Sequence, residues 1–215
     1  MAKSEYLMTE GSIWRKIVGF AVPVLIGRLF QQLYNTADSL VVGQLVGTSA
    51  LAAVSSVGNI IFMLVGFFMG FSQGAGIIIG NDIGAQDEKA VHRGVHTAIA
   101  MGLAFSVIMT VLGVWLSPVM LRLLDTPADV MPEATLYLRW YFAGSTGLVM
   151  YNTFVGILQA SGDSRHPLYY LIFSSCLNAV LDFCFIRFFG MGVEGAALAT
   201  ILGQFLSAVL VLRRL

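Results

Sequence analysis

Three charged side chains, those of Arg28, Asp38 and Asp182, lie inside long apolar segments and are the residues best placed to do chemistry. A charge within a membrane-spanning helix is costly, so such a residue is by default a functional candidate. Oxygen-bearing neighbours accompany the aspartates in three segments: Gln31, Gln32, Tyr34, Asn35 and Thr36; Asn178; and Ala196, Thr200 and Gln204. Carboxylates, an amide, a hydroxyl and a backbone carbonyl are hard oxygen donors. They suit a small hard cation or a proton shared between buried carboxylates.

A simpler explanation of the two aspartates stays open. Asp38 and Asp182 could merely satisfy buried partners such as Arg28 or Asn178. Arg28 precedes Asp38 by ten residues, which is about 15 Å along a helix, so a direct ion pair requires a bend. Pro23 could supply that bend, because proline removes a backbone hydrogen bond and kinks a helix.

Three other patterns carry weaker signals. Residues 70–74 match G-x-S-x-G, the pattern of a hydrolase nucleophile elbow, but that elbow needs a strand-to-helix turn and a histidine base. His92 and His96 lie one helical turn apart without a third metal ligand at fixed spacing. Cys176 and Cys184 are about 12 Å apart along one helix, too far for a disulfide. We interpret these patterns as structural and expect no enzymatic activity.

The composition is that of a membrane protein. Of 215 residues, 57% are hydrophobic and 11% are charged, whereas soluble domains carry about a quarter charged residues. Twelve basic and twelve acidic residues cancel, so there is no basic field to bind nucleic acid. Neither a soluble globular domain nor a disordered chain fits these values.

Six apolar segments are long enough to cross a bilayer, which takes about 20 residues. They cover residues 13–42, 50–80, 95–121, 135–160, 166–188 and 194–212. Short stretches with turn residues separate them. The sequence therefore predicts an all-α integral membrane protein, with one domain over residues 1–215. We expect a bundle of six transmembrane helices in which consecutive helices are antiparallel neighbours.

Lysine and arginine predict the orientation of the bundle, because they are enriched in cytoplasmic loops. With six spans, one side collects eight of them and the other collects three, namely Arg122, Arg139 and Arg187. Both termini are therefore expected in the cytoplasm. The aromatic residues Tyr137, Trp140 and Tyr141 at the start of the fourth span are expected at the outer interface.

This orientation puts the polar residues of three spans at similar depth. With a rise of about 1.5 Å per residue and a hydrocarbon core of about 30 Å, Asp38, Asp182 and Thr200 lie about 6, 8 and 9 Å below its outer edge. The three helices are thus expected to converge on one cation site.

Small residues at four-residue spacing predict close helix packing. In the second span they form two sets, Gly66, Gly70 and Gly74, and then Gly76, Gly80 and Gly84. The third span repeats the pattern with Gly94, Ala98, Gly102 and Ser106. We expect each set to face a neighbouring helix.

Several motifs occur in an order that resembles the multidrug and toxic compound extrusion (MATE) family. The segments that carry the resemblance are 8–11, Pro23, 30–38, 42–43, 84–87, 162–167, 178–182 and 195–200. Each motif is weak alone, but the ordered set is specific and covers nearly the whole chain.

The resemblance implies the N-terminal six-helix lobe of a twelve-helix transporter. Family members are antiporters that exchange organic, often cationic or aromatic, compounds for sodium or protons. A bacterial-type plasma (inner) membrane is the implied location, and no cofactor is expected. Matched one by one, the family's cation site falls on Asp38, Asn178, Asp182, Thr200 and Ala196. Its substrate cavity falls on Gln31, Tyr34 and Asn152, and Pro23 is the expected hinge.

Two features depart from the resemblance. Arg28 stands where resembled sequences usually carry a neutral polar residue, and a cation there could repel cationic compounds. The second lobe is missing, although alternating access needs one lobe to rock against the other. We therefore expect either a fragment or a chain that pairs with a C-terminal lobe or a second copy.

Two other functions stay open. A lipid-linked precursor flippase of a related fold should line its cavity with several basic residues, and only Arg28 qualifies. A non-transporting membrane scaffold would leave Asp38 and Asp182 unexplained.

Overall fold

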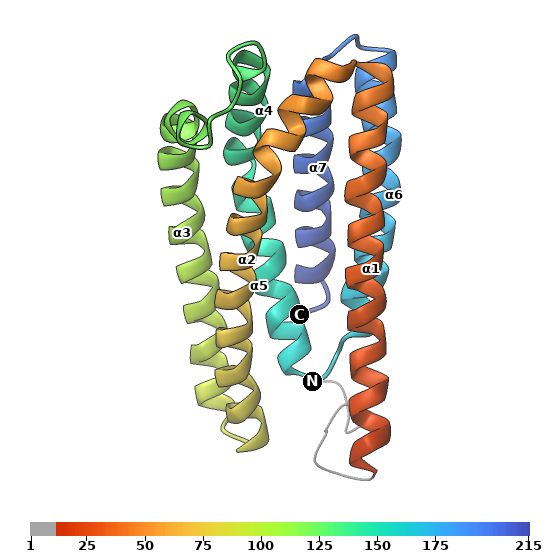
Figure 1. The fold of residues 1–215 in the computed structure, drawn as a ribbon. Helices are drawn as coiled ribbons and strands as arrows, with labels where there is room; N and C mark the ends of the chain where they lie inside the picture. Colours follow the sequence, from red (N-terminus) through yellow and green to blue (C-terminus); the bar gives the residue numbers. More distant parts are fainter. Residues whose placement is uncertain (1–11) are drawn as a thin grey trace.

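The computed structural model describes residues 12–215 as a bundle of helices (Figure 1). Their bounds are α1 Ile13–Leu45, α2 Thr48–Gly84, α3 Glu88–Leu123, α4 Met131–Ala143, α5 Ser145–Ala160, α6 Arg165–Arg187 and α7 Val193–Leu212. Five of them, α1, α2, α3, α6 and α7, are long and apolar enough to cross a membrane. The all-helical membrane architecture is thereby confirmed. The count of six spans and the cytoplasmic termini stay predictions.

The predicted fourth span, 135–160, differs from one continuous helix. It is divided into α4 and α5, of 13 and 16 residues, each shorter than the about 20 residues that cross a bilayer. The two follow one another along the bundle (Figure 1) and meet at Gly144. A Cβ at Gly144 would collide with Ile201 of α7. The missing side chain therefore lets α7 pack directly against the break.

Two clusters of buried apolar side chains hold the bundle together. The first joins the end of α1 to α2, α4 and α7 and includes Val42, Val57, Phe142 and Ala196. The second joins α5 to the far parts of α2 and α7 and includes Ile79, Phe154 and Val211. Large apolar side chains also cover the outside, where Phe62, Trp115 and Leu123 are 79%, 80% and 79% exposed. Such a surface suits hydrocarbon rather than water.

The small-residue stripes divide into packed and open faces. In α3, a Cβ on Gly102 would lie 3.0 Å from Thr153 Oγ1, and Ala98 and Ser106 are buried. The prediction of close packing is therefore confirmed for this stripe. In α2, a Cβ on Gly76 would lie 3.1 Å from the Gly156 carbonyl oxygen, so this part of α2 packs on α5.

The other glycine face of α2 is open. A Cβ on Gly66, Gly70 or Gly74 would have no atom within 4 Å, and the same holds for Gly84. Among residues 12–215, therefore, no helix packs on these positions, and the predicted packed face is not found there. In Figure 1, α2 starts beside the end of α1 and leans away from it along the bundle. Spacing reports which residues share a face but not whether a partner covers that face.

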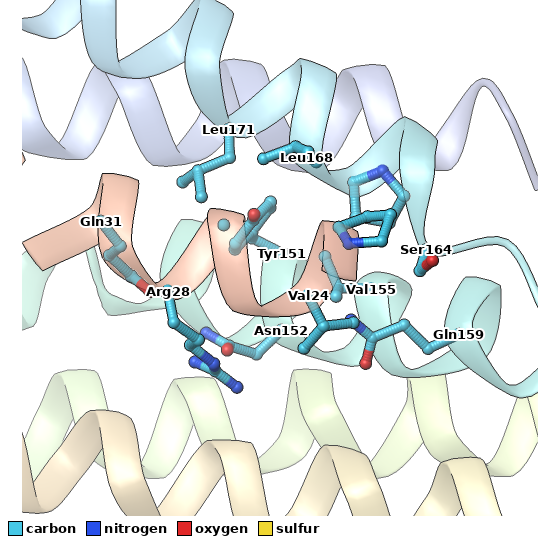
Figure 2. Close-up of a pocket in the computed structure, with 13 residues that line it drawn as sticks. Val24, Arg28, Gln31, Tyr151, Asn152, Val155, Gln159, Ser164, Leu168 and Leu171 are labelled. Carbon is cyan, nitrogen blue, oxygen red and sulfur yellow. The ribbon is translucent and has the colours of Figure 1, made fainter. Parts of the chain in front are cut away.

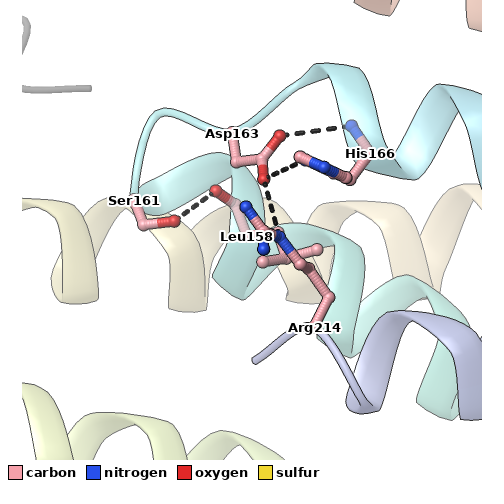
Figure 3. Close-up of polar contacts among 5 residues, drawn as sticks. All are labelled: Leu158, Ser161, Asp163, His166 and Arg214. Carbon is pink, nitrogen blue, oxygen red and sulfur yellow. Dashed lines mark hydrogen bonds and ion pairs between the residues drawn. The ribbon is translucent and has the colours of Figure 1, made fainter. Parts of the chain in front are cut away.

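Asp163 ties three elements together at the turn between α5 and α6 (Figure 3). Its Oδ1 accepts a hydrogen bond from the backbone N–H of His166 at 3.2 Å, which satisfies a free donor in the first turn of α6. Its Oδ2 lies 2.6 Å from His166 Nδ1 and 3.7 Å from Arg214 Nε. The start of α6 is thereby fixed beside the end of α7, which sets the relative height of the two helices.

Candidate functional site

Four of the predicted cation-site side chains come together from α1, α6 and α7. The carboxyl groups of Asp38 and Asp182 are near enough to interact electrostatically. Asn178 Nδ2 donates a hydrogen bond to Thr200 Oγ1 at 3.4 Å. Ala196, one turn before Thr200, is completely buried. The structure therefore reproduces the convergence expected from depth, while a role in cation binding stays a prediction.

Most oxygens of this group lack a hydrogen-bond donor among residues 12–215. Asp182 is completely buried, and neither of its carboxyl oxygens has a partner. Asp38 Oδ1 and Asn178 Oδ1 are also buried without one. About nine tenths of buried polar atoms in folded proteins are paired. Four acceptor oxygens thus lie together without a donor from residues 12–215, an arrangement that suits a proton shared by the two carboxyl groups or a small cation.

The simpler explanation through Arg28 is wrong for the described part of the chain. Residues 12–215 contain two ion pairs, and both involve Asp163. Arg28 therefore forms no ion pair with Asp38. Helix α1 also continues through Pro23 without interruption, which keeps Arg28 and Asp38 about 15 Å apart along the axis. Asn178 donates a hydrogen bond to the Thr200 hydroxyl rather than to a carboxylate.

Tyr141 is a neighbour of this group that the sequence interpretation missed. It interacts electrostatically with Asp38 and is 8% exposed. Its ring stacks with that of Tyr137, which is also buried. Both tyrosines therefore face other helices rather than lipid, whereas Trp140 is 40% exposed, and the expected position of all three at the outer interface stays a prediction. The four-residue spacing of the tyrosines was the available signal, since it puts both on one helix face.

A pocket lies between α1, α5 and α6 (Figure 2). The space enclosed by its lining, together with the open solvent at its mouth, is about 490 Å³. The pocket brings together Gln31, Asn152 and Pro23, three residues expected to serve substrate or hinge. The side chain of Tyr34 lies outside the described residues. The full lining is Pro23, Val24, Gly27, Arg28, Gln31, Tyr151, Asn152, Val155, Gln159, Ser164, Pro167, Leu168 and Leu171.

The weaker sequence patterns form neither a nucleophile elbow nor a group of metal ligands among residues 12–215. Ser72 lies inside α2 and donates a hydrogen bond to the Asn152 carbonyl oxygen at 2.5 Å, so it is not a nucleophile on a turn. The rings of His92 and His96 stack on an exposed surface. Within residues 12–215, no three His, Cys, Asp or Glu side chains group as metal ligands.

Comparison with known proteins assigns the family. The sequence model of the MatE family matches residues 23–184. The chain belongs to the MatE family. The resemblance that the motifs indicated is thus confirmed.

The relatives of this MATE chain are about twice its length. It is 34% identical to the probable multidrug resistance protein YpnP of Bacillus subtilis, over 93% of this chain and 45% of that protein. It is 29% identical to the probable multidrug resistance protein NorM of Thermotoga maritima, over 91% of this chain and 43% of that protein. A crystal structure of a MATE in the bent conformation matches with a TM-score of 0.91 at 28% identity, covering 98% of this chain and 47% of that one. The chain is a multi-pass membrane protein that spans about half the length of the curated relatives it matches.

Proposed function

We propose that this chain is the N-terminal lobe of a cation-coupled antiporter that exports organic drug-like compounds. The observation that carries the proposal is the group of buried, unpaired oxygens supplied by Asp38, Asn178 and Asp182. The names of the relatives as multidrug resistance proteins support export of organic compounds. The coupling ion is sodium or a proton, because the same oxygens accept either.

Helix α1 connects ion binding to substrate binding. It carries Asp38 at one site and Pro23, Arg28 and Gln31 in the pocket. A cation held between Asp38 and Asp182 offsets the repulsion of two carboxylates and favours an arrangement in which they stay close. Repacking of α1 in response, with Pro23 as hinge, changes the shape of the pocket. We infer that ion binding from outside expels the substrate and that substrate binding from inside favours the ion-free state.

The proposed setting follows from the family and from the charge distribution. The lobe works with a C-terminal lobe or a second copy, in a bacterial-type inner membrane with both termini in the cytoplasm. Exchange needs no cofactor and no nucleic acid. A flippase for lipid-linked precursors is not favoured, because Arg28 is the single basic residue of the pocket lining.

Binding of radiolabelled sodium to the purified chain, measured across pH, tests the proposal. We expect saturable binding that acid displaces and that Asp182→Ala abolishes. Asp129→Ala is the matched control, since Asp129 is an exposed acid in the α3–α4 connection. Saturable sodium binding that survives Asp182→Ala contradicts the site. Absence of sodium binding in a folded chain leaves proton exchange as the coupling event, to be read as proton uptake that Asp182→Ala reduces.

A further inference from the structure

Arg28 lies inside the apolar stretch of α1 that is long enough to cross a membrane. It follows Ile13 by fifteen residues and precedes Leu45 by seventeen, which places it near the middle of a helix about 50 Å long. Long basic side chains reach the interface only from near helix ends. The cost of placing this charge must therefore be offset inside the protein or by a bound molecule.

The described residues do not neutralise Arg28. Its Nη1 lies 3.3 Å from the Met69 sulfur, which is a weak acceptor. No ion pair among residues 12–215 includes Arg28, and the pocket lining contains neither aspartate nor glutamate. The pocket therefore carries an unbalanced positive charge.

The rest of the lining divides into polar and apolar walls. Leu168 and Leu171 of α6 face Val24 and Val155 across the pocket, while Gln31, Asn152 and Gln159 contribute amides. In Figure 2, Arg28 points away from Leu168 and Leu171, on the side of α2. The planar guanidinium presents a fork of N–H donors that matches the two oxygens of a carboxylate or phosphate. Apolar walls suit an aromatic or aliphatic body.

We propose that the pocket selects organic anions, in which an apolar body carries a carboxylate or phosphate, and that Arg28 determines this specificity. The inference rests on the proposed export function and refines its substrate class. It runs against the cationic compounds that the family resemblance led us to expect. The oxyanion would supply the partner that Arg28 lacks, and the body would occupy the face lined by Leu168 and Leu171.

Three probes that share one ring system test the charge preference. Radiolabelled 2-naphthoate, 2-naphthylmethanol and 2-naphthylmethylammonium are dialysed against the chain in nanodiscs of zwitterionic lipid. We expect naphthoate to bind at least about tenfold more tightly than the ammonium compound, a difference of about 1.4 kcal/mol. Arg28→Gln should weaken naphthoate binding by about tenfold or more and leave the alcohol unchanged, while Arg28→Lys should keep part of the preference. Arg93→Gln, at an exposed position of α3, should change nothing.

Sodium binding on the same samples separates this inference from the proposed function. Arg28→Gln should bind sodium as the unaltered chain does, which also shows that the variant is folded. Equal binding of the anion and the cation, or naphthoate binding that survives Arg28→Gln, overturns the inference while sodium binding upholds the antiport proposal. Anion preference without sodium or proton coupling would instead contradict the proposed function alone.

Discussion

The acid site, formed by Asp38, Asn178, Asp182 and Thr200, shares helix α1 with the pocket that contains Arg28. The two sites carry opposite charges and are built differently. Asn178 and Asp182 are buried to 2% and 0% exposure, in a group to which α1, α6 and α7 all contribute. The pocket opens between α1, α5 and α6, and Arg28 in it is exposed. A closed cage of fixed oxygens selects an ion by size and charge, whereas an open pocket with apolar walls admits compounds of varied shape. This difference fits the proposed exchange, in which one ion is constant and the organic compound varies.

Asp163 is a buried acid of the same chain whose carboxyl oxygens do have partners, and it can be compared with Asp182. It is 5% exposed, and its oxygens contact the His166 backbone, the His166 ring and Arg214. Asp182 is as deeply buried and has no such contact. Asp163, which holds helices together, therefore has partners within the fold, whereas Asp182, which is proposed to bind an ion, has none among residues 12–215.

The largest expected effect is the loss of sodium-dependent stability in Asp182→Asn. Sodium at about 100 times its dissociation constant should raise the free energy of unfolding of the unaltered chain by about 2.7 kcal/mol. Asp182→Asn should show no increment, because the amide cannot offset the charge of the ion. Thermal unfolding in sodium and in choline salts measures the difference. Asp129→Asn should respond as the unaltered chain does, and an equal response of Asp182→Asn would contradict the acid site.

A second prediction concerns the wall behind the pocket. A Cβ at Gly156 would collide with Ser72 Oγ and lie 2.7 Å from the Ser72 carbonyl oxygen. Gly156→Ala should therefore force α2 and α5 apart and lower the free energy of unfolding by about 1–3 kcal/mol, as overpacking does. Naphthoate binding should also weaken, because Asn152 lies one turn away on α5. A stable Gly156→Ala variant would mean that the α2–α5 contact is looser than the structure indicates.

Much of the fold could be predicted from the sequence, because a bilayer permits few structures. Apolar length and turn residues located α1, α2, α3, α6 and α7 and treated α4 and α5 as one span. A constant rise per residue predicted one depth for Asp38, Asp182 and Thr200. The break at Gly144 could not be predicted, since it depends on Ile201, which is far away in the chain. Burial of Tyr141 depends in the same way on which neighbours cover α4. The charge of Arg28 is visible in the sequence, but its lack of an acidic neighbour is a property of the assembled bundle.

The third prediction concerns Asp163, and the expected loss of stability is smaller. Asp163→Ala removes a helix-end hydrogen bond and the contacts with His166 and Arg214, and should lower the free energy of unfolding by about 1–2 kcal/mol. In sodium-free buffer, Asp182→Asn should by contrast leave stability unchanged or raise it, because it removes an unpaired buried charge. Thermal unfolding of both variants beside Asp129→Ala gives the comparison. If Asp182→Asn lost more stability than Asp163→Ala without sodium, Asp182 would have a structural role.

The smallest effect is expected from Gly70→Ala, on the open face of α2. A Cβ at Gly70 has no atom within 4 Å, and alanine is favoured over glycine inside a helix by about 1 kcal/mol. The variant should therefore unfold at the same temperature as the unaltered chain or slightly above it, in contrast to Gly156→Ala. A clear loss of stability would require a partner that covers Gly66, Gly70 and Gly74. In that case a concentration-dependent unfolding temperature identifies the partner as a second copy of the chain. The glycine stripe would then mark the surface on which two lobes meet.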